Sequence, residues 1–248
     1  MIMILGSVHD DVLYFESVMT DRREEVVMGS YKVQIVKIFN QEVLLVYDIY
    51  TSYISAMLTN YLIEKYFVLL IFIVGKCISF NEDLKPGEIA VSKRVIAGDV
   101  DQIREANVRL GQIPGFPPNF KSEDEIMKLV ATSIEKRSFS KYKLSSFISS
   151  NSIIDASSKV VNIETGGYMF GHKNNLVFDC TSVGVCISAY IHKVPFVAVK
   201  VVERILNTPP TTDSYIKVLQ EFSSVGKAIV TCIGEISHND VIKGGENV

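Results

Sequence analysis

Residues 66–75 read YFVLLIFIVG and residues 196–202 read FVAVKVV, and these two apolar stretches decide the fold class. The first is about half of the roughly 20 apolar residues that a helix needs to cross a bilayer, so it predicts a buried strand and no membrane span. Strands that are apolar on both faces are typical of a sheet covered by helices on both sides. The two stretches therefore predict an α/β fold.

Weaker patterns around these strands supply the remaining elements. Further strands are expected at 2–5, 31–38, 42–47, 88–96, 144–150 and 176–178. Helices are expected at 54–62, at 122–134 behind a capping box of Ser122 and Glu125, at 181–192, and at 213–232 with Asp213 as the cap. We expect one three-layer α/β/α domain over residues 1–248 with a central mixed sheet and a disordered tail from about 240 to 248.

Composition excludes several classes of protein. The net charge is −3, so the chain has no basic excess with which to neutralise a nucleic-acid backbone. The first residues, MIMILGSVHDD, lack the basic region of a secretory signal. The four cysteines are far apart and form no C-x-x-C pair, so they predict reduced thiols in a cytoplasmic protein without disulfides or zinc: Cys77, Cys180, Cys186 and Cys232.

Four motifs stand in the order and spacing of one known family: LKPGEIAVS (84–92), Asp99-Val100-Asp101, GQIPGFPPNFKSEDEIMKLV (111–130) and VPFVAVK (194–200). Over about residues 1 to 235 the chain resembles the 5′-methylthioadenosine/S-adenosylhomocysteine nucleosidases of the purine nucleoside phosphorylase superfamily. The resemblance implies a nucleoside phosphorylase-like fold. It also implies cleavage of the N-glycosidic bond of adenine nucleosides, without a metal or cofactor.

In that family an Asp protonates purine N7, one Glu activates the attacking water, and a second Glu binds the ribose hydroxyls. The segment that ends in the proton-donating Asp falls on Lys200-Val201-Val202-Glu203-Arg204, so Arg204 replaces the acid. A guanidinium has no transferable proton at neutral pH, which leaves the neighbouring Glu203 as the candidate substitute. The ribose-binding Glu falls on Thr181, and the water-activating Glu falls on Asp11, a shorter carboxylate.

The resemblance also assigns the other pocket positions. The family's glycine motif falls on 73–79 and its stacking Phe on Ile154, so two positions of close backbone approach now carry side chains. The residues that depart from the family's motifs are therefore concentrated at the site, whereas the scaffold motifs are kept. The remaining expected pocket residues are Ser7, Val8, Tyr50, Lys76, Cys77, Ile78, Asp155, Asp179 and Cys180.

The best-matched motif is the one that helps to form the dimer interface in the family. It includes Asp99, Asp101, Gly111, Gln112 and Pro114. We therefore expect a two-fold dimer, formed with a second copy of this chain or with an active relative.

Several site residues have a second, plainer interpretation. Asp11 is either a residual general base or a carboxylate that caps the turn after the first strand, and capping is favoured. Lys76 and Arg204 either form an anion site or are solvated side chains in surface ion pairs. Asp179 either binds a ligand or satisfies backbone amides.

The thiols and imidazoles give no separate chemistry. Cys77 and Cys180 fall at pocket positions, but without a placed histidine partner they are expected to pack as buried thiols and not to act as nucleophiles. The histidines have no metal-ligand spacing and are expected to be ordinary side chains: His9, His172, His192 and His238.

Three functions remain open. The first is a dimeric binding or regulatory pseudoenzyme that has lost N-glycosidic hydrolysis and holds a small nucleoside-like or anionic ligand. The second is a divergent nucleosidase or phosphorylase with a relocated acid, either Glu203 or Asp179. The third is storage or a purely structural role.

Overall fold

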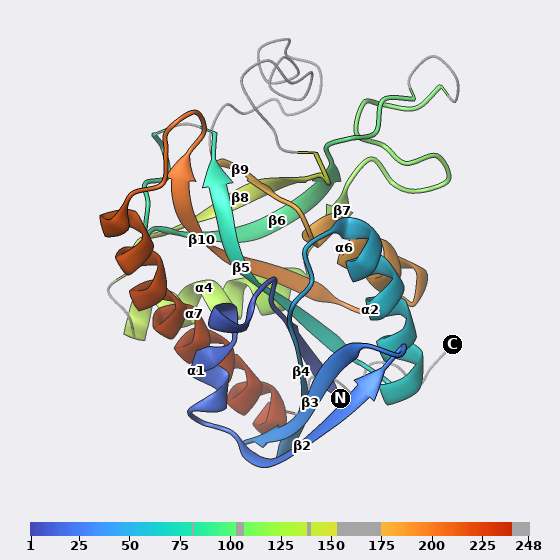
Figure 1. The fold of residues 1–248 in the computed structure, drawn as a ribbon, viewed down its shortest axis with the longest axis vertical. Helices are drawn as coiled ribbons and strands as arrows, with labels where there is room; N and C mark the ends of the chain where they lie inside the picture. The colour runs from blue at the N-terminus through green and yellow to red at the C-terminus, as the bar shows by residue number, and fades with distance from the viewer. Residues whose placement is uncertain (81, 103–106, 138–139, 153–174, 240–248) are drawn as a thin grey trace.

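The computed structural model describes residues 1–80, 82–102, 107–137, 140–152 and 175–239 (Figure 1). Its strands are β1 (Ile2–Leu5), β2 (Thr20–Val27), β3 (Tyr31–Ile38), β4 (Gln41–Val46), β5 (Leu70–Ser79), β6 (Ile89–Ala97), β7 (Phe120–Lys121), β8 (Tyr142–Ser149), β9 (Leu176–Asp179) and β10 (Phe196–Ile205). Its helices are η1 (His9–Asp11), α1 (Leu13–Glu16), α2 (Ser52–Tyr66), α4 (Asp124–Arg137), α6 (Ser182–Ile191) and α7 (Thr212–Asn239).

The strands form one mixed sheet in the order β10-β6-β8-β9-β5-β1-β4-β3-β2, with β7 added to β6. β10 pairs with β6 and also with β5, so five of the strands close into a ring. From β5 the sheet continues as an open half, in which β1 is parallel to both β4 and β5. The mixed sheet predicted from the sequence is confirmed.

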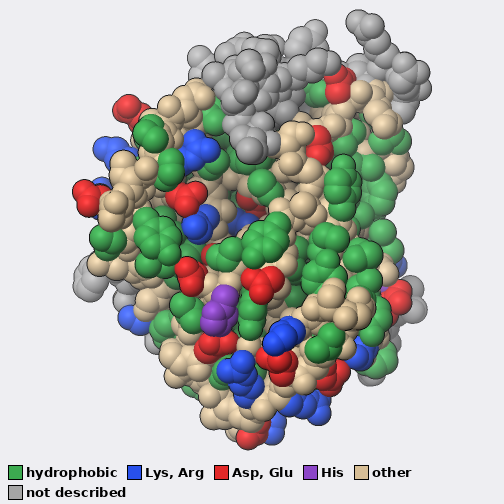
Figure 2. Space-filling view, viewed as in Figure 1, with side chains coloured by type: hydrophobic (Ala, Val, Ile, Leu, Met, Phe, Trp, Pro, Cys, Tyr) green, Lys and Arg blue, Asp and Glu red, His purple; other side chains and the backbone are tan. Residues whose placement is uncertain are grey.

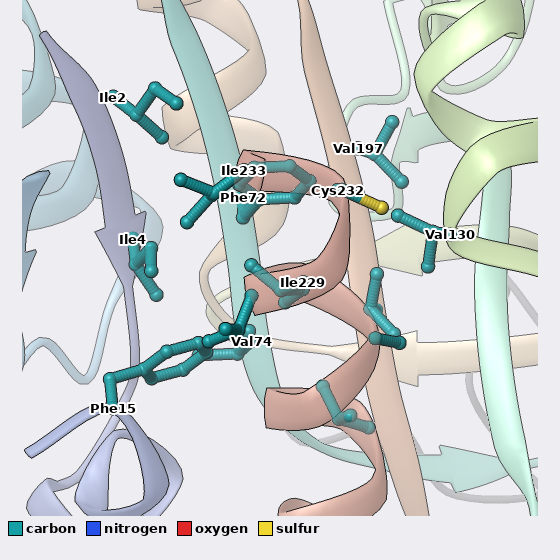
Figure 3. Close-up of a cluster of buried hydrophobic side chains, with 14 of the residues drawn as sticks. Ile2, Ile4, Phe15, Phe72, Val74, Val130, Val197, Ile229, Cys232 and Ile233 are labelled. Carbon is teal, nitrogen blue, oxygen red and sulfur yellow. The ribbon is translucent and has the colours of Figure 1, made fainter. Parts of the chain in front are cut away.

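Helices cover both faces of the sheet. In Figure 1, α1, α4 and α7 lie on one side, and α2 and α6 pack together on the other. Under α7 the core joins Ile4 and Phe72 of the sheet to Ile229 and Ile233 of the helix, as Figure 3 shows. A second core of buried aliphatic side chains lies under α2 and α6. The three-layer arrangement follows from the apolar residues on both faces of β1, β5 and β10.

The apolar run at 66–75 forms a strand, but the strand starts later than the sequence predicts. Tyr66 ends α2, and Phe67 adopts a left-handed conformation with φ 51° before β5 begins at Leu70. The run therefore joins the end of a helix to the start of a strand of similar apolarity. Among the described residues, no helix is both long enough and apolar enough to span a membrane.

The edge strand β2 was not predicted. Its sequence, TDRREEVV, is charged and largely exposed, so it lacks the alternating apolar pattern that marks a half-buried strand. It pairs with β3 at the edge of the sheet. Charged side chains are typical of edge strands because they oppose pairing with another chain.

Two predicted helix caps are wrong in detail. α4 begins at Asp124, so Ser122 lies one residue before the cap position, and its hydroxyl lies 2.6 Å from the Ser92 hydroxyl. At the start of α7 the cap is Thr211 and not Asp213. Its Oγ1 accepts from the Ser214 amide at 3.1 Å, while Ser214 Oγ accepts from the Thr211 amide at 3.0 Å.

Candidate active site

A cavity of about 240 Å³ lies where β1, β5, β9 and β10 end. Figure 2 shows acidic and basic side chains around a hollow on this face. Eleven of the lining residues are positions that the sequence assigned to the site. The lining residues are Ser7, Val8, Asp11, Tyr50, Lys76, Cys77, Ile78, Phe178, Asp179, Cys180, Thr181, Lys200 and Glu203.

Asp11 is held at the turn that follows β1. Its Oδ2 accepts hydrogen bonds from the backbone amides of Ser7 at 2.7 Å and Val8 at 3.0 Å. Its Oδ1 is buried and has no hydrogen-bond partner among the described residues. Burial raises the pKa of this carboxyl, against the backbone hydrogen bonds and the lysine charges, which act to lower it. The capping interpretation is therefore correct for one oxygen, while the other remains available to a ligand or a water.

Gly75 makes room for this carboxylate. It has φ 134°, and a Cβ at this position would lie 2.8 Å from Asp11 Oδ2. A larger residue would therefore displace Asp11 or strain the backbone. Of the family's glycine motif, this is the glycine that the chain keeps, and the structure gives a physical reason for it.

A buried ion pair that the sequence did not predict forms the floor of the site. Lys200 of β10 is 1% exposed, and its Nζ lies 2.8 Å from Asp179 Oδ2 and 3.2 Å from Thr181 Oγ1. Burial would lower the pKa of Lys200, but the adjacent Asp179 carboxylate outweighs burial and raises it. Asp179 also accepts from the amide and the hydroxyl of Ser182. Thr181, at the ribose-binding position, therefore faces an ammonium group.

A second ion pair lines the same cavity. Lys76 Nζ lies 3.2 Å from Glu203 Oε1, and the two side chains are 29% and 27% exposed. Glu203 falls at a register shift in the pairing of β10 with β5, between Val202, which pairs with Cys77, and Arg204, which pairs with Ile78. A bulge of this kind re-aims a side chain. It brings Glu203, and not Arg204, into the lining of the cavity.

Arg204 lies outside that lining. Its Nη1 donates to the backbone oxygen of Thr208 at 3.3 Å, in the turn after β10. Of the two interpretations of Arg204, an anion site or a solvated side chain, this geometry favours the second. Ile154 and Asp155 belong to a segment outside the described residues.

The structure describes both cavity thiols and the side chains of two of the four histidines. Burial raises the pKa of both Cys77 and Cys180, which favours the thiol over the nucleophilic thiolate. His9 pairs with Glu16 at 3.1 Å, and His192 lies 2.8 Å from Asn60 Oδ1. Where the structure is described, it contains no group of side chains that could hold a metal ion. His172 and the side chain of His238 lie outside the described part.

The predicted interface loop is tied to the helix beside the cavity. Asp99 Oδ2 accepts from the Asn151 amide at 3.1 Å, and Asn151 Oδ1 accepts from the amide of Ser52, the first residue of α2, at 2.7 Å. Within the loop, the Gly111 amide donates to Val100 O, and the Gln112 side chain donates to Phe116 O, both at 2.9 Å. Asp99, at the start of this loop, is thus linked through Asn151 to the start of α2.

Solved structures share this fold. A 5′-methylthioadenosine/S-adenosylhomocysteine nucleosidase from Neisseria meningitidis, in complex with methylthio-immucillin-A, matches with a TM-score of 0.81 over 94% of this chain and 98% of that one, at 14% identity. The native structure of futalosine hydrolase from Helicobacter pylori matches with a TM-score of 0.82 over 94% and 97%, at 16% identity. The nucleoside phosphorylase-like fold is confirmed.

Sequence comparison agrees with the fold. A relative from Staphylococcus haemolyticus named 5′-methylthioadenosine/S-adenosylhomocysteine nucleosidase is 27% identical over 84% of this chain and 87% of its own length. The family model described as the phosphorylase superfamily matches residues 2–233. The resemblance to the nucleosidases is therefore confirmed, and this chain belongs to the phosphorylase superfamily.

Proposed function

We propose that this protein binds a small, uncharged nucleoside-like ligand in the 240 Å³ cavity and has lost the hydrolysis of methylthioadenosine and adenosylhomocysteine. It would then act as a binding or regulatory pseudoenzyme. One observation carries the proposal: each of the three carboxylates that line the cavity has at least one oxygen bound by groups of the chain itself, and both Asp179 and Glu203 are held in ion pairs with lysines.

Hydrolysis of an N-glycosidic bond needs a proton donor for the departing base and a base for the attacking water. Asp179 is bound to Lys200 and Ser182, and Glu203 is bound to Lys76. A carboxylate in an ion pair only accepts hydrogen bonds, so either group would have to leave its lysine before it could donate a proton. Arg204, at the family's acid position, is turned to Thr208.

The charges in the cavity support an uncharged ligand. Three carboxylates against two ammonium groups leave a formal net charge of −1. Both lysines are already neutralised, which disfavours a phosphate or another anionic ligand at this site. The rest of the lining carries no charge and includes the apolar side chains of Ile78 and Phe178.

Calorimetric titration of the protein with methylthioadenosine and with adenosylhomocysteine, followed by chromatography for adenine, tests this proposal. We expect saturable binding by at least one of the two nucleosides without release of adenine. Steady turnover would contradict the loss of activity. The absence of binding by a folded protein would contradict the nucleoside-binding role.

A second candidate, a slow nucleosidase, is favoured by the free oxygen of Asp11. A buried carboxylate with a raised pKa and an unpartnered Oδ1 can accept a proton from a water bound beside it. This candidate predicts adenine release that is abolished in Asp11→Asn. Release that is unchanged in Asp11→Asn would rule out Asp11 as the base.

We further propose that the chain forms a two-fold dimer, with its own copy or with an active relative. Tyr53 and Met57 of α2 are 73% and 44% exposed, and Tyr190 and Ile191 of α6 are 52% and 56% exposed. Figure 2 shows hydrophobic side chains gathered on the side where α2 and α6 lie.

A cytoplasmic location stays a prediction, in keeping with the free thiols of all four cysteines.

A further inference from the structure

Lys76 and Glu203 differ from the other charged groups in the cavity because they are only partly buried. Their side chains are 29% and 27% exposed, whereas those of Lys200 and Asp179 are 1% and 2% exposed. The Lys200 pair is thus enclosed by the protein. The Lys76 pair instead presents its remaining polar atoms to the cavity and its mouth.

The pair uses a fraction of its hydrogen-bonding capacity. One N–H of Lys76 meets Oε1 of Glu203 at 3.2 Å. An ammonium has three N–H groups and a carboxylate has two oxygens. The bond to Lys76 is made by Oε1, and among the described residues no hydrogen bond is found for the second carboxylate oxygen, Glu203 Oε2. A donor and an acceptor therefore lie side by side at the cavity.

Neighbouring groups fix Lys76 in place. Its Nζ lies 5.5 Å from the centre of the Tyr215 ring, within the range of a cation–π interaction. The Tyr215 hydroxyl donates to Asp10 Oδ2 at 3.3 Å, next to Asp11. The donor and acceptor are thus held by β5, by the bulge of β10 and by the first turn of α7. Preorganisation of this kind gives hydrogen bonds their specificity for a ligand.

We infer that Lys76 and Glu203 recognise the edge of an uncharged heterocycle that carries a hydrogen-bond acceptor next to an N–H donor. This inference rests on the proposed nucleoside-binding function. The acceptor binds the Lys76 ammonium and the donor binds Glu203 Oε2, while the ring packs among Cys77, Ile78 and Phe178. The bases of adenosine and inosine both have such an edge, whereas the unsubstituted purine base of nebularine has acceptors only.

The test is calorimetric titration of the full chain with adenosine, inosine and nebularine. A site built to bind a donor rejects the analogue that lacks it, so we expect nebularine to bind at least about 10-fold more weakly than the better of the other two. In Glu203→Met this ratio is expected to fall to within about 2-fold, because the acceptor is gone. Lys76→Met is expected to weaken all three ligands.

A matched ion pair outside the cavity supplies the control. Lys32 Nζ lies 3.4 Å from Glu24 Oε1, and the two side chains are 63% and 37% exposed, so Lys32→Met and Glu24→Met should keep the ratio of the wild type. Equal binding of nebularine and adenosine by the wild type, or a ratio that survives Glu203→Met, would overturn this inference alone. If the folded wild type binds none of the three nucleosides, the proposed function is contradicted as well.

Discussion

Lys200 is a lysine in the middle of the apolar strand FVAVKVV, and it is almost completely buried. A buried charge is tolerated only when it is paired and hydrogen-bonded, and here Asp179 and Thr181 provide both interactions. The strand pattern thus contained a signal for a site residue. The sequence alone did not identify the partner, because Asp179 is far away along the chain.

Removal of Lys200 is predicted to destabilise the fold strongly. Lys200→Met leaves Asp179 buried without its counter-ion, and breaking a buried pair in this way costs about 3–5 kcal/mol. The double variant Lys200→Met/Asp179→Asn removes both charges and should recover much of that loss. Urea unfolding of the three proteins measures the difference. A single variant as stable as the wild type would show that the pair is not buried.

Asp11 is predicted to make stability depend on pH. Its pKa in the folded protein is raised above the ordinary value of 3.8, so ionisation of Asp11 costs the folded state more than the unfolded state. The cost is absent well below pH 3.8 and develops as pH rises through the raised pKa. Asp11→Asn should therefore gain stability relative to the wild type as pH rises towards 7. A difference that is constant with pH would contradict the raised pKa.

Most of the cavity residues could be predicted because their positions follow from motifs close to strand ends. The position of Arg204 outside the cavity could not be predicted, because the bulge that turns Glu203 into the cavity shifts the register by one residue. Such an irregularity leaves no mark in the apolar pattern of β10. Phe178 was missed for a similar reason, since an apolar residue in a strand is ordinarily assigned to the core.

At the scale of elements, α2 and α6 pack so closely that one glycine is required between them. A Cβ on Gly184 would lie 2.0 Å from the Ser52 backbone oxygen and 2.3 Å from Ser55 Oγ. Gly184→Ala should therefore cost about 3 kcal/mol, at the upper end of the cost of overpacking, and disturb the start of α2. Thermal unfolding of the variant measures this cost.

Ser188→Ala on the same helix is the control for this prediction. It removes one hydrogen bond, from Ser188 Oγ to Ala56 O at 2.7 Å, without adding an atom. The expected loss is about 1 kcal/mol. If Gly184→Ala were as mild as this control, the close approach of the two helices would be incorrect.

The elements with strong apolar patterns were predictable, and those without them were not. Residues 31–38 and 196–202 are strands, as their alternation or continuous apolarity indicates. β2 is held in the sheet by its pairing with β3, which no local pattern reveals. At 66–75 a helix end and a strand start share one apolar run, so their boundary depends on the left-handed turn at Phe67.

At the scale of the whole molecule, the proposed dimer is predicted to depend on the exposed face of α2. Sedimentation velocity should give twice the monomer mass for the wild type. Tyr53→Asp and Met57→Asp together place two charges on that face and should yield monomers. Phe67→Asp, at an aromatic residue that is 78% exposed at the far end of α2, should leave the dimer intact. A monomeric wild type would contradict the proposal.

The most direct test of the central claim is to count the adenine released when the protein is in excess over methylthioadenosine or adenosylhomocysteine. Under these conditions even one slow turnover per site converts all bound substrate. With Asp179 and Glu203 both held in ion pairs with lysines, we predict bound nucleoside and no adenine above the uncatalysed blank. Stoichiometric adenine release by the wild type would contradict the account and identify the protein as a nucleosidase.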